Sequence, residues 1–422
     1  LFREQASALG LAIQVREAEV EETAAQPLLP LRHNRRGPAL AVADLDANGE
    51  DELLVSGSTL DLPQRLVRVA SGSWSAGPLT PVPTAAQVND GPLLVFDANR
   101  DGRMDVLLSR GGSSLPAGAP DYQPLLLLAD GAGARLQAAL DALSPLPIST
   151  GAAVAADFDR DGVLDVFLGG RVAPGLFPLA PPSALLSRRD GRWQDVTAAV
   201  APGLAEVGLV TSALWSDVDG DGWIDLLLAL DWGGIQFWRN REGRVLENQS
   251  EAGGFAAAGT GWWTTLAAAD FNRDGRPDYV AGNLGLNTPY QASPERPERL
   301  YLGEFRDGAP PVLIEATHDG DRVVPRRTLK QLATSLPALR RKYPKNNDYA
   351  RATLAEVVGA GPLAAAQSWT ATEFRSGVFL SQPDGRHRFT PLPRRAQLAP
   401  WQGVAAGRSE EHTSELQSRY VI

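Results

Sequence analysis

The sequence of 422 residues contains no cysteine and only four histidines. A chain without cysteine has no disulfide scaffold, no thiolate-bound zinc, no iron–sulfur cluster and no cysteine nucleophile. It also lacks any apolar run of about 18 residues, so we expect no transmembrane helix. The net charge of −10 at pH 7 argues against non-specific binding to nucleic acid. These absences argue against a disulfide-rich protein, a thiolate–metal protein, a protein with a transmembrane helix and a non-specific nucleic-acid binder.

A nine-residue pattern, D-x-[DN]-x-[DN]-G-x-x-[DE], occurs five times at nearly even spacing. Each copy lies between two short apolar runs, such as GAAVAA and VFLGG around the third copy. Short apolar runs between Asp/Gly turns are typical of β-strands. Each copy is therefore predicted to be a loop that joins two antiparallel strands. The copies begin at Asp44, Asp97, Asp157, Asp217 and Asp270.

The repeat also predicts the fold. Glycine (42) and proline (32) are plentiful, as in turn-rich β proteins. Three or four strands in a repeat of about 55 residues are typical of a propeller blade. The sequence therefore predicts an all-β fold, a β-propeller of about seven blades that is incomplete in this chain. A β-solenoid is the alternative, although its repeats are usually shorter.

The pattern weakens after the fifth copy. Residues 301–315 look like a shortened sixth copy, to which we assign no metal because its carboxylates have the wrong spacing. The following leucines recur at helical spacing and predict a small helical insertion near 328–359. Strands are expected to resume after this insertion.

The residue types of the pattern are suited to a metal. Positions 1, 3 and 5 place carboxylate or amide oxygens on one side of a tight loop, and glycine at position 6 permits the sharp turn. Position 7 can add a backbone carbonyl, and the acid at position 9 can complete the shell. Hard oxygen ligands suit Ca²⁺, whereas Mg²⁺ prefers a tighter octahedron and Zn²⁺ prefers histidine or cysteine.

We therefore predict up to five structural Ca²⁺ sites. The first is the least regular, since it contains Asn48 and Glu52. The predicted ligands are Asp44, Asp46, Asn48, Glu52, Asp97, Asn99, Asp101, Asp105, Asp157, Asp159, Asp161, Asp165, Asp217, Asp219, Asp221, Asp225, Asp270, Asn272, Asp274 and Asp278.

The pattern has two other interpretations. An EF-hand loop shares its first half but requires a bidentate glutamate at position 12 and flanking helices. Position 12 is apolar in every copy: Val55, Leu108, Leu168, Leu228 and Ala281. Ordinary Asp/Gly turns without a metal are the second interpretation. Calcium is favoured over it because carboxylates spaced so closely repel one another without a cation.

These loops resemble those of FG-GAP and VCBS repeat proteins, which are seven-bladed propellers with calcium in such loops. QPLLP (26–30), GWWTTLAAADFNRDGRPDYVAGNLGLN (261–287) and PLPRRAQLAPWQGVAA (391–406) are also similar to bacterial secreted VCBS-repeat proteins related to the UnbV/cartilage acidic protein group. The resemblance covers about residues 25–407. It implies a propeller, a calcium role and an exported protein, located extracellularly, at the cell surface or in the periplasm. It implies no particular ligand.

We expect three segments along the chain. Residues 1–36 are charged and poorly periodic, and are interpreted as the tail of an earlier unit. Residues 37–407 are predicted to form the propeller with its insertion. Residues 408–422 begin with RSEEHTSELQS, which looks like a translated sequencing adapter, and are interpreted as an artefact. Since the chain also starts at Leu1, we expect it to be a fragment of a longer protein.

Several other side chains invite a functional interpretation. Asn283 and Asn287 are expected to have turn or cap roles rather than to bind a substrate. The tryptophans of the later repeats are expected to pack between blades rather than to stack on sugars: Trp215, Trp232, Trp238, Trp262 and Trp263. A basic cluster is expected to be a solvated helix face, with an acidic partner as the alternative: Arg340, Arg341, Lys342 and Lys345.

The sequence contains no nucleophile-elbow, zincin or P-loop motif. The predicted function is therefore a calcium-binding, exported propeller without enzymatic activity, which mediates adhesion through a protein or glycan ligand. The alternative is a propeller enzyme that acts on polysaccharides or glycosides, and a purely structural scaffold is the third possibility. An enzyme would need a non-repeated acid, histidine or tyrosine near the central channel, and the sequence does not place one there.

Overall fold

The computed structural model of the chain describes residues 4–34, 37–70, 72–79, 87–130, 135–306, 308 and 310–405. The segment 408–422 that we interpret as an artefact lies outside these residues. The chain divides into two compact units. Unit 1 contains the described parts of 1–21, 32–210 and 240–247, and unit 2 contains those of 22–31, 211–239 and 248–422.

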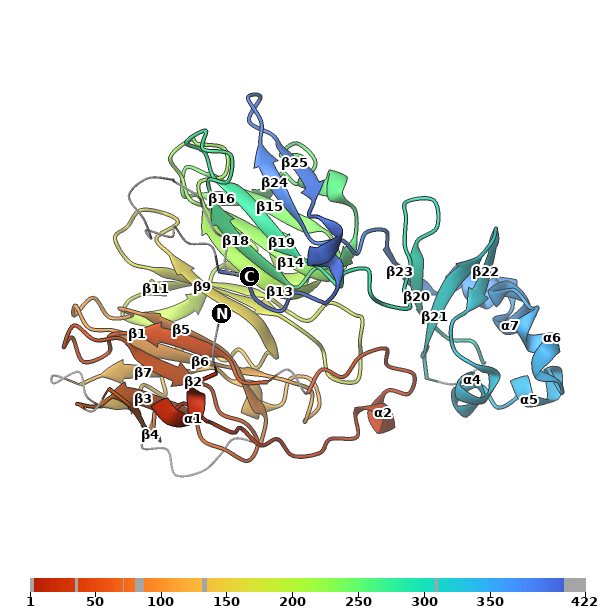
Figure 1. The fold of residues 1–422 in the computed structure, drawn as a ribbon, viewed down its shortest axis with the longest axis horizontal. Helices are drawn as coiled ribbons and strands as arrows, with labels where there is room; N and C mark the ends of the chain where they lie inside the picture. Colours follow the sequence, from red (N-terminus) through yellow and green to blue (C-terminus); the bar gives the residue numbers. More distant parts are fainter. Residues whose placement is uncertain are drawn as a thin grey trace. The chain divides into compact units, whose positions relative to one another are not determined.

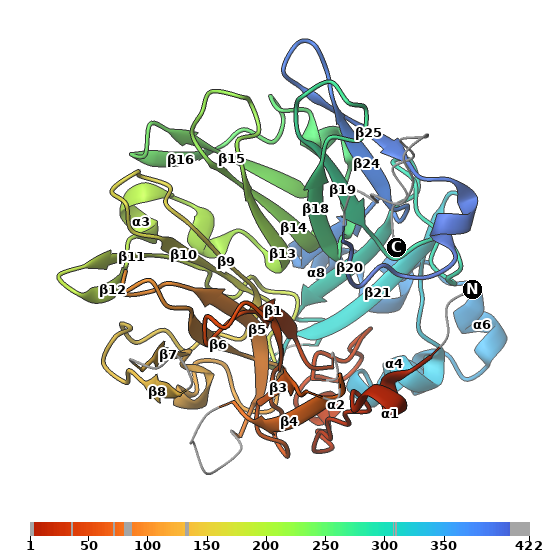
Figure 2. The ribbon, with the colours of Figure 1, turned by 60° about the vertical axis from the view of Figure 1, so that its left-hand side comes forward.

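Unit 1 contains three four-stranded antiparallel sheets, visible as successive blades in Figure 2. In each sheet the strands follow one another in chain order, which is the arrangement of a propeller blade. The first consists of β1 (Leu40–Ala43), β2 (Glu52–Val55), β3 (Gln64–Arg68) and β4 (Trp74–Pro78). The second consists of β5 (Asn89–Phe96), β6 (Asp105–Gly111), β7 (Leu125–Ala129) and β8 (Leu136–Ala138). The third consists of β9 (Thr150–Ala156), β10 (Asp165–Gly170), β11 (Ala184–Arg189) and β12 (Arg192–Asp195).

The core of unit 1 lies between the faces of these sheets. The second strand of each sheet is rich in aliphatic residues, and Val106, Leu107 and Leu108 of β6 are at most 1% exposed. Phe96 at the end of β5 meets Trp193 of β12 edge to face, with 5.8 Å between the ring centroids. The first strand β5 contacts the first strands of the two neighbouring sheets, β1 and β9. The loops that follow these first strands therefore leave the sheets from neighbouring positions.

A fourth sheet has the order β13-β14-β15-β16, and a short fifth strand pairs with β14. Its strands are β13 (Leu209–Ser216), β14 (Asp225–Gly233), β15 (Ile235–Arg241), β16 (Val245–Asn248) and β17 (Gly261–Trp262). The core of unit 2 on this side is aromatic, because Phe255 lies 5.1 to 5.9 Å from the rings of Phe237, Tyr279 and Phe379.

The last two sheets are nested in the chain. Strands β18 (Thr265–Ala269) and β19 (Asp278–Gly282) are completed only by β24 (Gly377–Ser381) and β25 (His387–Pro391). Between β19 and β24 the chain forms a whole further sheet of order β22-β21-β20-β23. It consists of β20 (Glu298–Gly303), β21 (Val312–Asp319), β22 (Arg322–Pro325) and β23 (Gln367–Ala371). Residues 301–315 are thus part of a hairpin, but the sheet that contains them interrupts the fifth blade instead of following it.

The predicted helical insertion is confirmed, and it lies between β22 and β23. It consists of α4 (Leu329–Ser335), α5 (Leu339–Lys342), α6 (Asn346–Ala350), α7 (Leu354–Val358) and α8 (Ala360–Ala365). Figure 1 shows α4 to α7 gathered beside β21 and β22. Capping boxes begin α4 and α7, where Thr328 pairs with Gln331 and Thr353 pairs with Glu356. The insertion extends to Ala365, a few residues beyond the predicted end.

Three further helices of four residues each are α1 (Ala6–Leu9), α2 (Glu22–Ala25) and α3 (Thr197–Val200). Within the described residues, six antiparallel sheets account for nearly all other regular structure. The predicted all-β, propeller-type fold with a small helical insertion is therefore confirmed.

Candidate metal centres

Five acid loops carry the repeated pattern, and each joins the first strand of a sheet to the second. They are residues 44–52, 97–105, 157–165, 217–225 and 270–278, called loops 1 to 5. Position 1 of every loop directly follows the last residue of a first strand, and position 9 is the first residue of the second strand. Loops 1 to 3 belong to unit 1, and loops 4 and 5 belong to unit 2. The predicted strand–loop–strand context is confirmed in all five copies.

The same hydrogen bonds shape all five loops. The carboxylate at position 1 accepts the backbone N–H of the glycine at position 6, at 2.9 or 3.0 Å. The side chain at position 5 accepts the backbone N–H of position 7, at 2.7 to 3.0 Å. Short polar side chains that bond nearby backbone in this way stabilise tight turns. The loops are therefore held in shape by the same oxygens that are predicted to be ligands.

Two positions of every loop have left-handed backbone. Glycine at position 6 has φ from 81° to 88°, as the pattern predicts. Position 4 is left-handed as well, with φ from 55° to 73°. Four of its residues are not glycine and adopt a conformation that is uncommon for them: Ala47, Arg100, Arg160 and Arg273. The left-handed backbone at position 4 was not predicted from the sequence, because only loop 4 has a glycine there, Gly220.

The acid at position 9 has a structural role that sequence analysis did not assign. It is at most 2% exposed in each loop, and one of its oxygens accepts the N–H of position 2 at 2.7 to 3.3 Å. In loop 2 the other oxygen of Asp105 accepts the N–H of Ala129, and in loop 5 that of Asp278 accepts the N–H of Ser381. The position-9 acid therefore links its loop to the strands beside it.

Burial raises the pKa of several loop acids. Desolvation raises the pKa of Asp165 to about 7, against a hydrogen bond from Ser187 and with the support of the neighbouring charge on Asp159. Desolvation also raises the pKa of Asp159 itself and of Asp219 in loop 4. Ionisation of these crowded carboxylates is costly without a cation, and a bound cation would favour their charged form.

In loops 1, 3 and 4 the acids at positions 1, 3 and 9 converge, since each offers an oxygen within 4.8 Å of the others. One shielded carboxylate oxygen of each of these loops has no hydrogen-bond partner among the described residues: Oδ1 of Asp46, Asp157 and Asp217. A shielded carboxylate oxygen without a partner is destabilising, and a cation would satisfy it. The donors are all oxygens, so these residues fit Ca²⁺.

Loops 2 and 5 differ at position 3, where asparagine replaces aspartate. The amide groups of Asn99 and Asn272 donate to the position-5 carboxylates of Asp101 and Asp274, at 2.9 and 3.0 Å. These two loops retain oxygen donors at the predicted positions but have a lower negative charge.

Arginines neutralise four of the five loops. In loop 1, Arg65 of β3 contacts Asp46 at 2.9 Å and also pairs with Glu52. In loop 4, Arg239 of β15 contacts Asp221 at 2.9 Å and also pairs with Asp219. Loops 2 and 5 contain their own arginines, which pair with the position-5 acids. Among the described residues, the four aspartates of loop 3 form no ion pair, so loop 3 has the least compensated charge.

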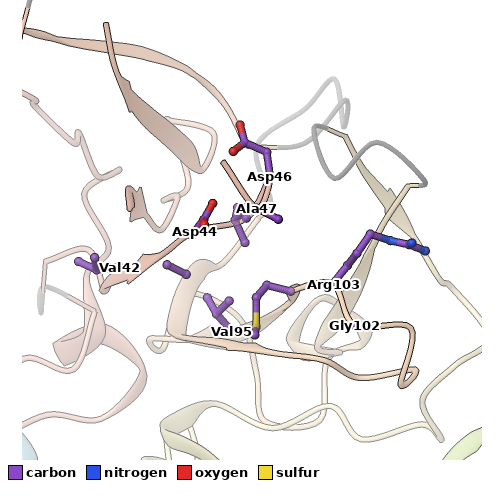
Figure 3. A pocket seen from close by; sticks show the side chains of 10 residues that line it. Val42, Asp44, Asp46, Ala47, Val95, Gly102 and Arg103 are labelled. Atoms are coloured by element: carbon purple, nitrogen blue, oxygen red, sulfur yellow. The ribbon is translucent and has the colours of Figure 1, made fainter. Parts of the chain in front are cut away.

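A pocket with a volume of about 750 Å³ lies between loops 1 and 2. Figure 3 shows Asp44, Asp46 and Ala47 of loop 1 at its edge, with Arg103 of loop 2 across from them. Apolar side chains also line it, including Val42, which is 64% exposed. The pocket thus combines an apolar wall with charged groups of both signs.

Four of the tryptophans that are expected to pack between blades are buried, at most 4% exposed: Trp232, Trp238, Trp262 and Trp263. Trp215 is half-buried. The side chain of Asn283 bonds the backbone of distant segments: it accepts from the N–H of Trp262 and donates to the carbonyl of Glu373. Asn287 donates to the carbonyl of Leu398 at 3.2 Å.

Sequence analysis missed a buried ionic cluster on β20 and β21. Glu298 and Glu315 are both 2% exposed. Glu315 accepts a hydrogen bond of 2.6 Å from the hydroxyl of Tyr290 and pairs with Arg327 at 2.7 Å, while Glu298 pairs with Arg326 at 3.2 Å. Each carboxylate is therefore neutralised by an arginine, as buried charges require.

A family model for an FG-GAP-like repeat matches residues 217–281, which contain loops 4 and 5. No curated protein sequence matches the chain significantly. Among solved structures, the chain is similar to an Agrocybe aegerita lectin described as recognising non-reducing terminal N-acetylglucosamine. That similarity has 15% identity, a TM-score of 0.37, and coverage of 88% of this chain and 84% of that one.

Two further solved structures are similar to the chain. A fucose-specific lectin from Aleuria aurantia matches at 13% identity and a TM-score of 0.36, covering 68% of this chain and 77% of its own. The V. cholerae biofilm matrix protein Bap1 matches at 12% identity and a TM-score of 0.31, and the match covers 59% of this chain and 35% of that one. Similarities this low do not transfer a ligand to this chain.

Proposed function

We propose that this protein is a calcium-binding, exported propeller that mediates adhesion by binding a protein or a glycan, without enzymatic activity. One observation carries the calcium part of the proposal. In three loops, three carboxylates converge, and one shielded carboxylate oxygen has no hydrogen-bond partner among the described residues. The same loop scaffold recurs in the other two copies. No described helix is long and apolar enough to cross a membrane.

The five loops are proposed to differ in affinity. Loop 3 has four aspartates that form no ion pair with a described residue, and only the more distant charge of Arg189 acts on Asp159, so loop 3 is proposed to bind Ca²⁺ most tightly. Loop 1 is proposed to bind most weakly, because Arg65 already occupies the space between Asp46 and Glu52. A guanidinium within ion-pair distance would have to move before a metal could bind both carboxylates.

We expect the double variant Asp157→Asn/Asp159→Asn to lose the tightest calcium site. Asparagine keeps an oxygen for the glycine N–H at position 6, so the loop should fold while losing two charges. In isothermal titration calorimetry, the highest-affinity phase should disappear and the stoichiometry should fall by one. The control is Asp190→Asn, a change at an exposed turn of the same sheet. A titration that is identical in both variants would contradict the proposed ranking.

The interaction part of the proposal is supported by the pocket between loops 1 and 2. Val42 and Met104 in its wall are 64% and 40% exposed, so apolar surface is accessible beside the charged groups of the two loops. A shallow apolar wall with carboxylates and a guanidinium at its edge can bind an amphipathic ligand, such as a sugar ring or a peptide.

Binding to a glycan array, with sugar release measured in parallel, tests this role. We expect Val42→Glu/Met104→Glu to weaken binding of a retained neutral glycan at least tenfold, because two carboxylates would line the apolar wall. Leu140→Glu is the control, since Leu140 is 80% exposed in the same unit and outside the pocket. An array with no bound glycan would contradict the glycan part of the proposal, and sugar release would favour the enzyme alternative.

A further inference from the structure

The helical insertion carries an unusual set of charges. All three lysines of the chain, Lys330, Lys342 and Lys345, lie within it, whereas arginines occur throughout. From Arg322 to Asn347 the chain contains eight cationic residues and no carboxylate. This stretch belongs to a protein whose net charge is −10. The insertion is therefore a positive region of an otherwise acidic chain.

Three of the eight cations have partners in the sheet below the helices. Arg322 pairs with Asp319, Arg326 with Glu298 and Arg327 with Glu315. The other five are exposed and form no ion pair with any described residue: Lys330, Arg340, Arg341, Lys342 and Lys345. We call these five residues the basic surface.

The basic surface is held in place by a core of its own. Leu332 and Leu354 are fully buried beneath the helices, and Leu339 is 5% exposed beside the two exposed arginines of α5. The hydroxyl of Tyr349 donates to the carbonyl of Arg327 at 2.7 Å. The ammonium group of Lys342 donates to the carbonyl of Glu356 near the end of α7. The cations are thus presented by packed helices, which lowers the entropy lost when a ligand binds.

We propose that the basic surface binds an acidic polysaccharide, a glycan whose sugars carry carboxylate or sulfate groups. Arginine matches such groups well, because its planar guanidinium donates two parallel hydrogen bonds to one carboxylate or sulfate. With about one charge per sugar, such a chain has a lower charge density than a nucleic-acid duplex, so the acidic remainder of the protein repels it less. This inference rests on the proposed function, because it assumes that the protein acts by binding a ligand. It is independent of the residues of the acid loops.

Other anionic partners fit less well. A duplex of DNA has one charge per about 1.7 Å and would be repelled by the acidic remainder. Binding of single strands relies on exposed aromatic platforms, but Tyr349 is 7% exposed and Tyr343 is half-buried beneath Lys342. A membrane-binding helix would expose large apolar side chains, and within the described residues none in this insertion is exposed.

The test measures binding of the protein to immobilised heparin and to hyaluronan, with dextran as the neutral probe. We expect binding to both acidic glycans at low salt, loss at high salt, and no binding to dextran. Arg340→Gln/Arg341→Gln should weaken binding roughly tenfold, as expected when two exposed charge contacts are lost. Arg394→Gln/Arg395→Gln is the matched control, because this second exposed arginine pair in unit 2 also forms no ion pair with any described residue.

Each other outcome overturns the inference: equal loss in both double variants, binding to dextran, or tighter binding to duplex DNA or anionic vesicles. All variants should melt at the wild-type temperature, since the exchanged side chains are exposed. Measurements in EDTA and in calcium separate the two proposals. If acidic glycans still bind in EDTA, and calcium does not raise the melting temperature, the calcium sites are refuted. The proposal that the basic surface binds acidic glycans is then supported. If calcium raises the melting temperature but no acidic glycan binds, only the proposal for the basic surface is refuted.

Discussion

Millimolar Ca²⁺ added to the EDTA-treated protein is expected to raise its melting temperature by at least about 5 °C, and Mg²⁺ is expected to have little effect. A ligand that binds only the folded state stabilises it by about 2.7 kcal/mol per site at 100 times its dissociation constant. For a unit of roughly 200 residues, this corresponds to roughly 5–10 °C for each filled site. Several filled sites would add to this shift.

The physical reason lies in the geometry of the loops. Loops 1, 3 and 4 each bring three carboxylates within 4.8 Å, and their mutual repulsion is present only when the chain is folded. A bound Ca²⁺ ion would replace the repulsion between the carboxylates by attraction to the cation, and it would satisfy the unpaired oxygens of Asp157 and Asp217. Magnesium holds its water and demands a tighter octahedron, so it should reverse the repulsion less well.

Two controls make the result specific to the loops. The Asp157→Asn/Asp159→Asn variant should show a smaller rise in calcium than the wild type, but a similar or higher melting temperature in EDTA. Asp190→Asn should behave as the wild type in both conditions. A protein that is folded in EDTA and shows no response to calcium would leave the acid loops as ordinary turns, and the calcium proposal would be wrong.

The loops were predictable because their chemistry is local. The acids at positions 1 and 5 and the glycine at position 6 interact within nine residues, so a short pattern contains the information. The left-handed residue at position 4 was not predictable, because arginine and alanine at that position give no sign of it. The surrounding hydrogen bonds of the loop, and not the preference of the residue itself, impose that conformation.

The differences in ion pairing between the loops could not be predicted from the sequence for another reason. Arg65 and Arg239 reach loops 1 and 4 from strands that follow later in the chain, so only the folded sheet brings them to the acids. The nesting of a whole sheet between β19 and β24 was hidden too, because apolar runs predict strands but not which strands pair. Partner choice depends on long-range packing, which a local pattern does not record.

The second large effect concerns the acid at position 9, and Asp278→Ala is expected to destabilise the protein by roughly 3–5 kcal/mol. Asp278 is fully buried and accepts three backbone N–H groups, from Phe271 at 2.8 Å, Asn272 at 3.2 Å and Ser381 at 2.7 Å. Each buried donor left without a partner costs about 1–3 kcal/mol, and water can reach part of this group of donors. The measurement is chemical unfolding of the variant and the wild type in EDTA.

The EDTA condition distinguishes a structural acid from a metal ligand. If Asp278 mainly joins loop 5 to β24, its loss destabilises the protein whether or not calcium is present. If it acts only as a ligand, the variant and the wild type should be equally stable in EDTA and differ only in calcium. The matched control is Asp384→Ala, at an exposed turn of the same sheet, which should change the unfolding free energy by about 0.5 kcal/mol or less. Because the hydrogen bond from position 2 to the position-9 acid recurs in all five loops, we expect the position-9 acids of loops 1 to 4 to stabilise the fold in the same way.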